Sequence, residues 1–246
     1  MRTEAANSKY VIKNRDVSKQ VTDIICKQII DGQYAIGELI PTEEALCNEF
    51  GIGRSSVREA IKTLESRGLV RKIQGKGVVV IDECIEATSD LLRIALAYQK
   101  TSLRDLMNFR VALELTTVDL AARNATAEDL EKMREQIECM VRQEYTQGDF
   151  AQHDYLFHEA IAKASGNSVV LLIIKTLRPL LYNQIVYTLD PKFNPELATN
   201  FHEAIYRAIE AKHPEVAVEA MRSHLSETQR IINQPIGPRF KTVAQW

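Results

Sequence analysis

The stretch Pro41–Ile81 reads PTEEALCNEFGIGRSSVREAIKTLESRGLVRKIQGKGVVVI and decides the fold of the first third of the chain. Two short helical patterns stand on either side of a turn that contains Gly51. β-rich residues then stand on both sides of Gly75-Lys76, a tip that suits a tight hairpin. Helix, turn, helix and hairpin in this order predict a winged helix-turn-helix, which places one helix in a groove of DNA.

Local signals place the ends of the two helices. Thr42 follows Pro41 and is the expected N-cap of the first helix, and Gly51 suits the position after its last turn, where a positive φ is favoured. Ser55 is the expected cap of the second helix, which should stop at Gly68. The apolar faces of the two helices are Ala45, Leu46 and Phe50, and Val57, Ile61 and Leu64.

The start of the second helix carries the candidate DNA contacts Arg54, Ser55, Ser56 and Arg58. A helix N-terminus offers unpaired N–H groups and a positive dipole, which suit phosphate oxygens. Arginine can also bind guanine with two parallel hydrogen bonds. Lys76 at the hairpin tip is expected to meet a phosphate or the minor groove. The alternative is a small helical subdomain that carries a hairpin without binding DNA.

Charge is distributed unevenly along a chain whose formal net charge is only −2. Residues 1–82 hold 13 Lys and Arg against 11 Asp and Glu, and the remainder hold 18 against 22. From Arg54 to Lys76 there are seven basic residues and two acidic ones. This excess would match a phosphate backbone, although a solvated helix face can have the same composition.

Composition is that of an ordinary soluble protein, with 45% hydrophobic and 26% charged residues in 246. This length allows two domains. No apolar run reaches the length of a signal peptide or a membrane span. The four cysteines are far apart and form no CxxC pair, so free thiols in a reducing cytoplasm are expected.

The first 81 residues resemble the DNA-binding domain of GntR-family bacterial regulators. That family has a Pro-(Ser/Thr)-Glu helix start, an R-x-x-V-R-E-A recognition helix and a G-x-G wing. Here these motifs are Pro41-Thr42-Glu43, Arg54–Ala60 and Gly75-Lys76-Gly77. The resemblance implies DNA contacts from the recognition helix and from Gly75, Lys76 and Gly77. Relatives often carry a basic DNA-contacting residue where this chain has Glu44, so no contact is expected there.

After the linker that follows residue 81, the sequence pattern predicts helices and no strands. Residues 82–89 form a short polar stretch that is interpreted as a linker, residues 90–233 an all-helical domain, for which the family resemblance described below implies effector binding and dimerisation, and residues 234–246 an irregular tail. About seven helices should form an antiparallel bundle, which makes the protein mostly α. Pro179 should kink one of them. The expected starts of the later helices are Ser102, Thr126, Asp149, Ser168, Asn194 and Pro214.

Four potential metal ligands lie on three of these helices. Asp154 and His158 are four residues apart and share one helix face, His202 lies near the start of a later helix, and His224 lies in the last. An Asp-His₃ set suits a divalent transition ion, with positions left for a further ligand. The alternative is that these are ordinary packed or surface histidines.

The second part of the chain resembles the all-helical FCD effector domain of the FadR branch of GntR regulators. Metal-binding members carry Asp-x₃-His, a His that opens a later helix and a His in the last helix, and all four positions are present here. The resemblance implies a divalent metal, expected to be Zn²⁺ with Ni²⁺ or Mn²⁺ as alternatives. It also implies that Arg110 pairs with a small carboxylate effector that bridges to the metal. An ion pair between Arg110 and Glu114 is the alternative for this arginine.

Together these features predict a cytoplasmic, homodimeric transcriptional regulator, expected to be a repressor, that binds palindromic operator DNA under the control of an organic acid. One alternative is a repressor for which the metal ion is itself the signal. Another is a helical metalloenzyme, but Glu159 and Glu203, which flank the histidines, are poorly placed as a general base.

Overall fold

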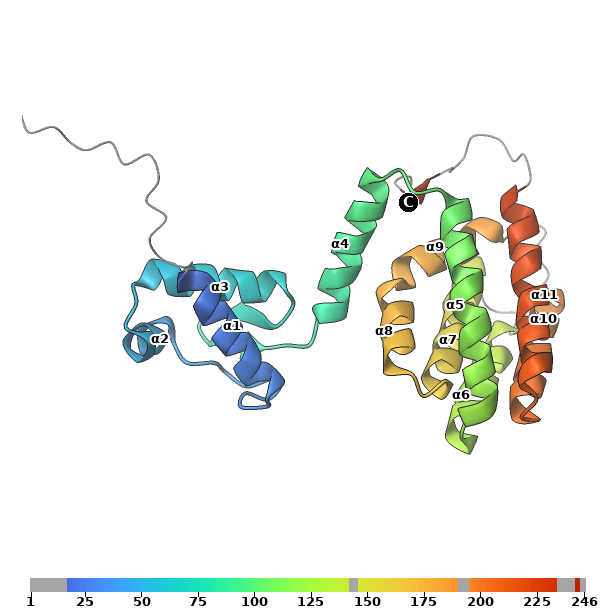
Figure 1. Cartoon of the computed structure of the whole chain (residues 1–246), viewed down its shortest axis with the longest axis horizontal. Coiled ribbons are helices and arrows are strands. Elements are labelled where there is room, and N and C mark those ends of the chain that lie inside the picture. The colour runs from blue at the N-terminus through green and yellow to red at the C-terminus, as the bar shows by residue number, and fades with distance from the viewer. Residues whose placement is uncertain (1–16, 142–145, 190–194, 234–241, 244–246) are drawn as a thin grey trace, which may run out of the picture. The chain divides into compact units, whose positions relative to one another are not determined.

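A computed structural model describes residues 17–141, 146–189, 195–233 and 242–243 of the chain. These residues form eleven helices and one two-stranded antiparallel sheet (Figure 1). They divide into two compact units, Met1–Thr88 and Ser89–Trp246. The predicted fold class, mostly α with an N-terminal winged helix-turn-helix and a C-terminal helical bundle, is confirmed.

The first unit contains α1 (Val17–Ile30), α2 (Glu43–Phe50), α3 (Arg54–Ser66), β1 (Val70–Ile73) and β2 (Gly77–Val80). Its core joins the apolar faces of all five elements, because each is too small to bury its own face. The buried residues include Ile25, Leu46, Val57, Ile61, Leu64, Val70 and Val80.

The predicted caps of α2, Thr42 and Gly51, are confirmed, but the predicted N-cap of α3, Ser55, is wrong. Thr42 Oγ1 accepts a hydrogen bond from Ala45 N at 3.2 Å, and Gly51 has a φ of 64° after the last turn. The helix α3 begins at Arg54 with Gly53 as its N-cap, and no side chain caps it. Ser55 therefore lies inside the first turn, where its backbone is already helical and its hydroxyl is exposed.

The predicted hairpin is present. Its strands pair from Val70 with Val80 to Ile73 with Gly77, and Gly75 at the tip has a φ of 76° that favours glycine. Leu39 forms an isolated antiparallel bridge to Val79, so this residue pairs with the edge of the hairpin.

The second unit is built from the helices that follow α4, together with most of α4 itself. Their bounds are α4 (Cys84–Tyr98), α5 (Leu103–Asn124), α6 (Ala127–Met140), α7 (Gln147–Ala164), α8 (Ser168–Thr176), α9 (Arg178–Thr188), α10 (Pro195–Glu210) and α11 (Pro214–Asn233). In place of one kinked helix at Pro179, there are two helices bent by 61°. The count is therefore eight in the described residues, where about seven were predicted.

Helix α4 begins within the stretch interpreted as a linker, so residues 84–89 are helical. Nothing in that polar stretch interrupts a helix, because it contains neither glycine nor proline. Most of the irregular tail expected at 234–246 lies outside the described residues. Within it, Thr242 forms an isolated bridge to Ser102, and Val243 is buried.

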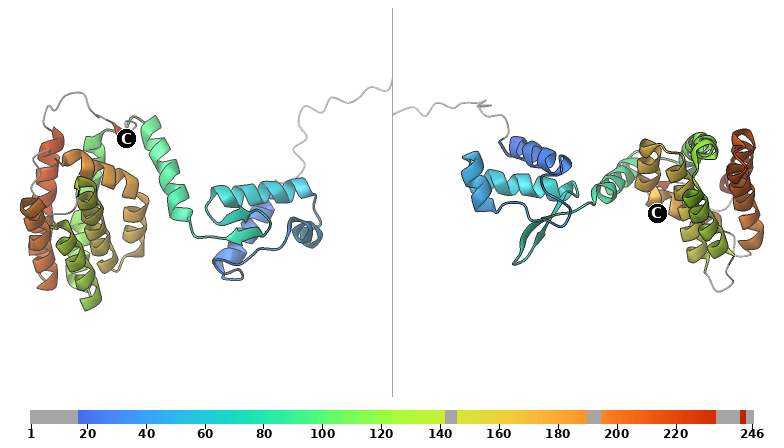
Figure 2. Two further views of the ribbon diagram at one scale, coloured as in Figure 1. Left: turned by 180° about the vertical axis from the view of Figure 1, so that it is seen from behind. Right: turned by 90° about the horizontal axis from the view of Figure 1, so that it is seen from below.

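The bundle brings four helices around one interior region. Helix α5 packs against α7 and α11, and α11 packs against α10, as the two further views also show (Figure 2). Buried residues of α5, α6, α7, α10 and α11 form one core cluster, and those of α7, α8 and α9 contribute to a second. No single described helix is long and apolar enough to cross a membrane. The bent pair α8 and α9, taken together, has the length and composition to do so.

Candidate functional site

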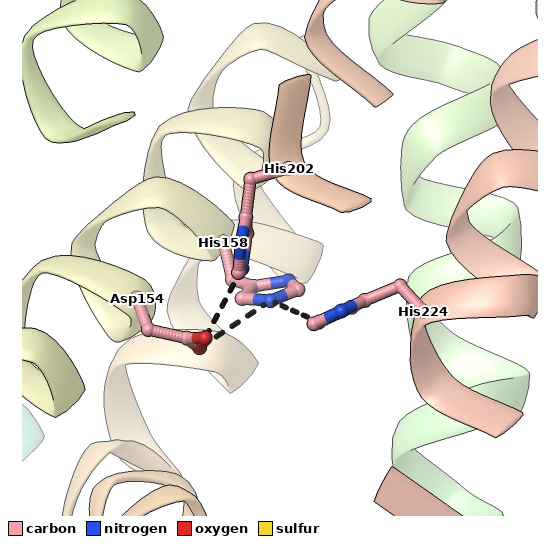
Figure 3. A group of neighbouring side chains, drawn as sticks. All are labelled: Asp154, His158, His202 and His224. Carbon is pink, nitrogen blue, oxygen red and sulfur yellow. Dashed lines mark hydrogen bonds and ion pairs between the residues drawn. The ribbon is translucent and has the colours of Figure 1, made fainter. Parts of the chain in front are cut away.

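The four predicted ligands converge inside the second unit. Asp154 and His158 extend from adjacent turns of α7, His202 from α10 and His224 from α11, and all four side chains point to one place (Figure 3). Each of the four residues is at most 8% exposed. The sequence therefore identified four residues that the fold does bring together.

The donor atoms that face one another are the Asp154 carboxylate oxygens and the three Nε2 atoms. His202 Nε2 lies 3.1 Å from Asp154 Oδ1, and His158 Nε2 lies 3.6 Å from Asp154 Oδ2. His158 Nε2 lies 3.2 Å from His224 Nε2. One donor atom from each residue lies within 4.8 Å of the others.

This arrangement fits a divalent transition metal. Two nitrogens bound to one tetrahedral Zn²⁺ at about 2.0–2.1 Å would be roughly 3.3–3.4 Å apart, close to the spacing between His158 and His224. Asp154 Oδ2 is buried and accepts no hydrogen bond from any residue that the structure describes. A buried carboxylate oxygen without a donor is costly, and a bound cation would stabilise it.

The start of α7 is fixed by a capping box about two turns before the first ligand. Thr146 Oγ1 accepts a hydrogen bond from Asp149 N, and the Asp149 carboxylate accepts one from Thr146 N. The helix was predicted to open at Asp149, which is instead its third residue. Because Asp154 and His158 lie in the following turns, this cap sets the register in which they face the interior.

Behind the ligands, α5 supplies a buried ion pair that touches one of them. Arg110 Nε donates to Glu114 Oε1, and Glu114 Oε2 lies against His158 Nδ1. Both residues are 3% exposed or less. The ion pair considered as an alternative for Arg110 is thus present. A guanidinium carries five N–H groups, so this pair leaves others for a second carboxylate.

Electrostatics favour the protonation states that a metal site needs. Burial would raise the pKa of Glu114, but the charges of Arg110 and then His158 lower it to about 2. Burial would likewise raise the pKa of Asp154, and the neighbouring histidines, His202 first, hold it below its usual value. Burial, followed by the charges of His202 and His158, lowers the pKa of His224. Ionised carboxylates and a neutral imidazole are the forms that bind metal.

Two residues near the site were not identified from the sequence in these roles. Glu114 was expected only as a partner of Arg110, because its contact with His158 depends on how α5 packs against α7. Gln184 on α9 is fully buried, and its Nε2 lies 2.8 Å from Met107 Sδ one turn before Arg110. Its Oε1 has no hydrogen-bond partner in the described part of the chain, and no spacing in the sequence marks it.

The predicted DNA-contact residues lie at two places on the first unit. Arg54, Ser55 and Arg58 are exposed, and Ser56 half-exposed, in the first turns of α3. Gly75, Lys76 and Gly77 are exposed where the hairpin turns into β2. Their contact with DNA stays a prediction.

Arg58 has a partner that the sequence did not predict. Its Nε donates to Glu43 Oε2 at 2.7 Å, and Lys72 Nζ donates to Glu43 Oε1 at 3.1 Å. Glu43 belongs to α2 and Lys72 to β1, so one carboxylate connects three elements of the first unit.

A winged helix-turn-helix joined to an all-helical unit is the architecture of a class of DNA-binding transcriptional regulators. Residues 17–80 match the description "Bacterial regulatory proteins, gntR family", and residues 105–227 match the FCD domain. The chain belongs to the GntR family of bacterial transcriptional regulators and carries an FCD domain.

Curated relatives match most of the chain. The Glc operon transcriptional activator of Escherichia coli K12 is 29% identical over 89% of this chain and 89% of its own. The transcriptional regulator LutR of Bacillus subtilis is 28% identical over 83% of this chain and 96% of its own. The putative L-lactate dehydrogenase operon regulatory protein of Escherichia coli K12 is 30% identical over 88% and 86%.

A solved structure shows the same fold. The GntR protein of Streptococcus agalactiae covers 87% of this chain and 99% of its own, with a TM-score of 0.68 and 24% identity. The domains and relatives are those of transcription regulators and not of enzymes. The metalloenzyme alternative is therefore not supported.

Proposed function

We propose that this regulator binds a small organic acid at a metal ion in its FCD domain and thereby changes its affinity for operator DNA. The observation that carries the proposal is the buried convergence of Asp154, His158, His202 and His224 beside Arg110. Burying four ionisable side chains together in a helical core destabilises a fold, and a bound cation would offset this cost.

The four ligands would hold the ion, for which Zn²⁺ is the first candidate and Ni²⁺ and Mn²⁺ are alternatives. A bound ion would supply a coordination position for a carboxylate oxygen of the effector. Arg110 would bind the same carboxylate through N–H groups that Glu114 does not use. One relative is named for an L-lactate dehydrogenase operon, and lactate is a small organic acid, which supports this class of effector.

DNA binding is assigned to Arg54, Ser55, Ser56 and Arg58 in the recognition helix and to Gly75, Lys76 and Gly77 in the wing. Arg58 would read base edges, and Lys76 would contact phosphate. Two copies would bind the halves of a palindrome, because a two-fold dimer matches a two-fold operator. Large apolar side chains on α4 support a homodimer: Leu91, Ile94 and Tyr98 are 66%, 55% and 85% exposed.

Effector and operator would be coupled reciprocally, so an acid that weakens DNA binding is itself bound less well by the DNA complex. With an acid that weakens DNA binding, the protein is a repressor that the acid releases from its operator. It would act in the cytoplasm, where the bacterial chromosome lies. An activator would use the same two sites with the coupling of opposite sign.

The test is a thermal-shift screen of the Zn²⁺-loaded protein against hydroxy acids, sugar acids and dicarboxylates, followed by mobility-shift assays on DNA. The true effector raises the melting temperature by mass action and changes DNA affinity, and Arg110→Ala abolishes both effects while the metal is retained. DNA binding that responds to the ion alone, with no response to any acid, would instead establish the metal-responsive alternative.

A further inference from the structure

Among the residues of the first unit that the structure describes, Glu43 is the one acidic side chain that forms ion pairs with two basic side chains, the candidate DNA contact Arg58 and Lys72 of β1. It opens α2 and is 22% exposed at its side chain, whereas the Arg58 and Lys72 side chains are 62% and 61% exposed. The hydrogen bonds from Arg58 and then Lys72 lower the pKa of Glu43, so it is ionised at neutral pH. The surface thus contains its own counter-ion.

The geometry of the contact determines which part of Arg58 remains available. Glu43 accepts from Nε, the nitrogen closest to the backbone, at 2.7 Å. The two terminal NH₂ groups are the ones left for another partner. An arginine binds guanine O6 and N7 with two parallel hydrogen bonds, and the terminal pair of NH₂ groups can supply them.

A tethered guanidinium differs from a free one in entropy. An unrestrained arginine side chain loses rotamer freedom when it is ordered. An arginine already held by a carboxylate loses less of it on binding DNA, and it is less free to turn toward a neighbouring phosphate. Preorganisation of this kind strengthens the specific contact relative to the non-specific one.

We infer that Glu43 is a specificity-determining positioning residue, which holds Arg58 for reading base edges and withholds Arg58 and Lys72 from non-specific phosphate binding. The inference rests on the proposed contact between Arg58 and operator DNA. It assigns a function to an acidic residue at a surface where a carboxylate would otherwise only repel DNA.

Glu44 provides a matched control. It is the next residue in the same first turn of α2, carries the same charge and is exposed, and the described residues show no ion pair to it. Glu43→Ala and Glu44→Ala therefore remove the same charge from the same helix end, and only the first removes the tether.

The experiment first uses the wild-type full-length chain to select binding sites from a random pool of DNA duplexes. Dissociation constants for the selected duplex and for a shuffled duplex of equal composition are then measured for wild type, Glu43→Ala, Glu44→Ala, Arg58→Ala and the Glu43→Ala/Arg58→Ala pair. Thermal unfolding of each variant checks that the fold is retained.

We expect both glutamate variants to bind shuffled DNA more tightly, because each adds one net positive charge. Glu43→Ala should also steepen the salt dependence by about one unit, since Lys72 becomes free to release a counter-ion. The ratio of shuffled to selected dissociation constants should fall about tenfold in Glu43→Ala and stay within about twofold in Glu44→Ala. In the Arg58→Ala background, Glu43→Ala should change this ratio no further, as two residues that act through one contact are not additive.

Equal ratios in Glu43→Ala and Glu44→Ala would overturn the inference, because charge alone would then explain both. A further fall in the ratio of shuffled to selected dissociation constants when Glu43→Ala is added to Arg58→Ala would also overturn it. If wild type enriches no sequence, or if Arg58→Ala binds like wild type, the proposed DNA contacts themselves fail.

Discussion

At the scale of the residue, Glu114 shows how a candidate metal ligand is held from behind. Its carboxylate lies between Arg110 and His158 Nδ1 and is buried with them. Carboxylates in this position fix the tautomer and orientation of a metal-binding imidazole, so that Nε2 faces the ion.

Glu114→Gln should weaken Zn²⁺ binding about 10- to 100-fold, because the amide keeps the shape but not the charge that orients His158 and pairs with Arg110. The measurement is a competition titration against a chromogenic chelator. Asp119→Asn on the same helix is the control, since it disrupts only the exposed ion pair with Arg123 and should leave the affinity unchanged. Unaltered Zn²⁺ affinity in Glu114→Gln would show that the carboxylate does not orient the ligand.

Lys76 is predicted to act through charge alone. Lys76→Ala should weaken binding to selected and shuffled duplexes by similar factors and reduce the salt slope by about one unit, as expected for one phosphate contact. Mobility-shift titrations at several salt concentrations measure both quantities. Selective loss of the selected duplex would instead make Lys76 a base-reading residue.

Helical spacing predicted the pairs that share a helix, whereas contacts between elements were predicted only where a family motif marked them, as for His202 and His224. Asp154 and His158 share a face by helical spacing alone, and so do Arg110 and Glu114. The contact of Glu114 with His158, and of Glu43 with Arg58, joins different elements. Their distances follow from how helices pack, which a single sequence does not specify.

At the scale of the element, Gly68 joins α3 to β1 in a conformation that no other residue fits well. Its φ is 72°, and a Cβ at this position would lie 2.3 Å from the backbone oxygen of Glu83. Backbone atoms cannot rotate away as a side chain can, so the adjacent segment would have to move.

Gly68→Ala should therefore destabilise the first unit by more than about 2 kcal/mol, the sum of left-handed strain and a backbone clash. Gly51→Ala is the matched control, because Gly51 has a φ of 64° with nothing within 4 Å of the added Cβ. It should lose only about 1 kcal/mol. Urea unfolding of the full chain followed by circular dichroism compares them, and equal losses would mean that the clash is relieved at no cost.

Capping boxes marked the starts of α5 and α6 correctly, whereas the start of α7, capped by Thr146, was placed at Asp149, three residues after the cap. Ser102 and Thr126 each form a capping box with the aspartate three residues later. The start of α3 was placed wrongly, because the cap is Gly53, which has no side chain to announce it. The start of α4 within residues 82–89 was missed because this short stretch is mostly polar and shows no apolar period.

At the scale of the whole molecule, the two units carry two separate kinds of chemistry. Both units could be predicted from the sequence. The order of the motifs identifies the winged helix-turn-helix, and the helical pattern identifies the bundle. The boundary was harder to place, because a helix spans it: α4 begins at Cys84, and the compact units divide after Thr88.

Removing the ion should destabilise the second unit while the first unit keeps its fold. Dialysis against a chelator should lower the melting temperature, and adding Zn²⁺ should restore it, because a ligand at 100 times its dissociation constant adds about 2.7 kcal/mol. Differential scanning calorimetry before and after dialysis measures the change. His224→Ala should show a much smaller difference between the two conditions, and a wild-type melting temperature that dialysis and Zn²⁺ leave unchanged would contradict a metal site.

The burial of the four ligands also affects how long a bound ion stays in the site. Any ion held by Asp154, His158, His202 and His224 is enclosed by α7, α10 and α11, and its release requires these helices to separate locally. Its residence time is then set by the opening rate of the bundle and not by the strength of the coordination bonds alone. A carboxylate effector that reaches the ion must enter the same buried site, so the same opening of the bundle should limit how fast the effector binds.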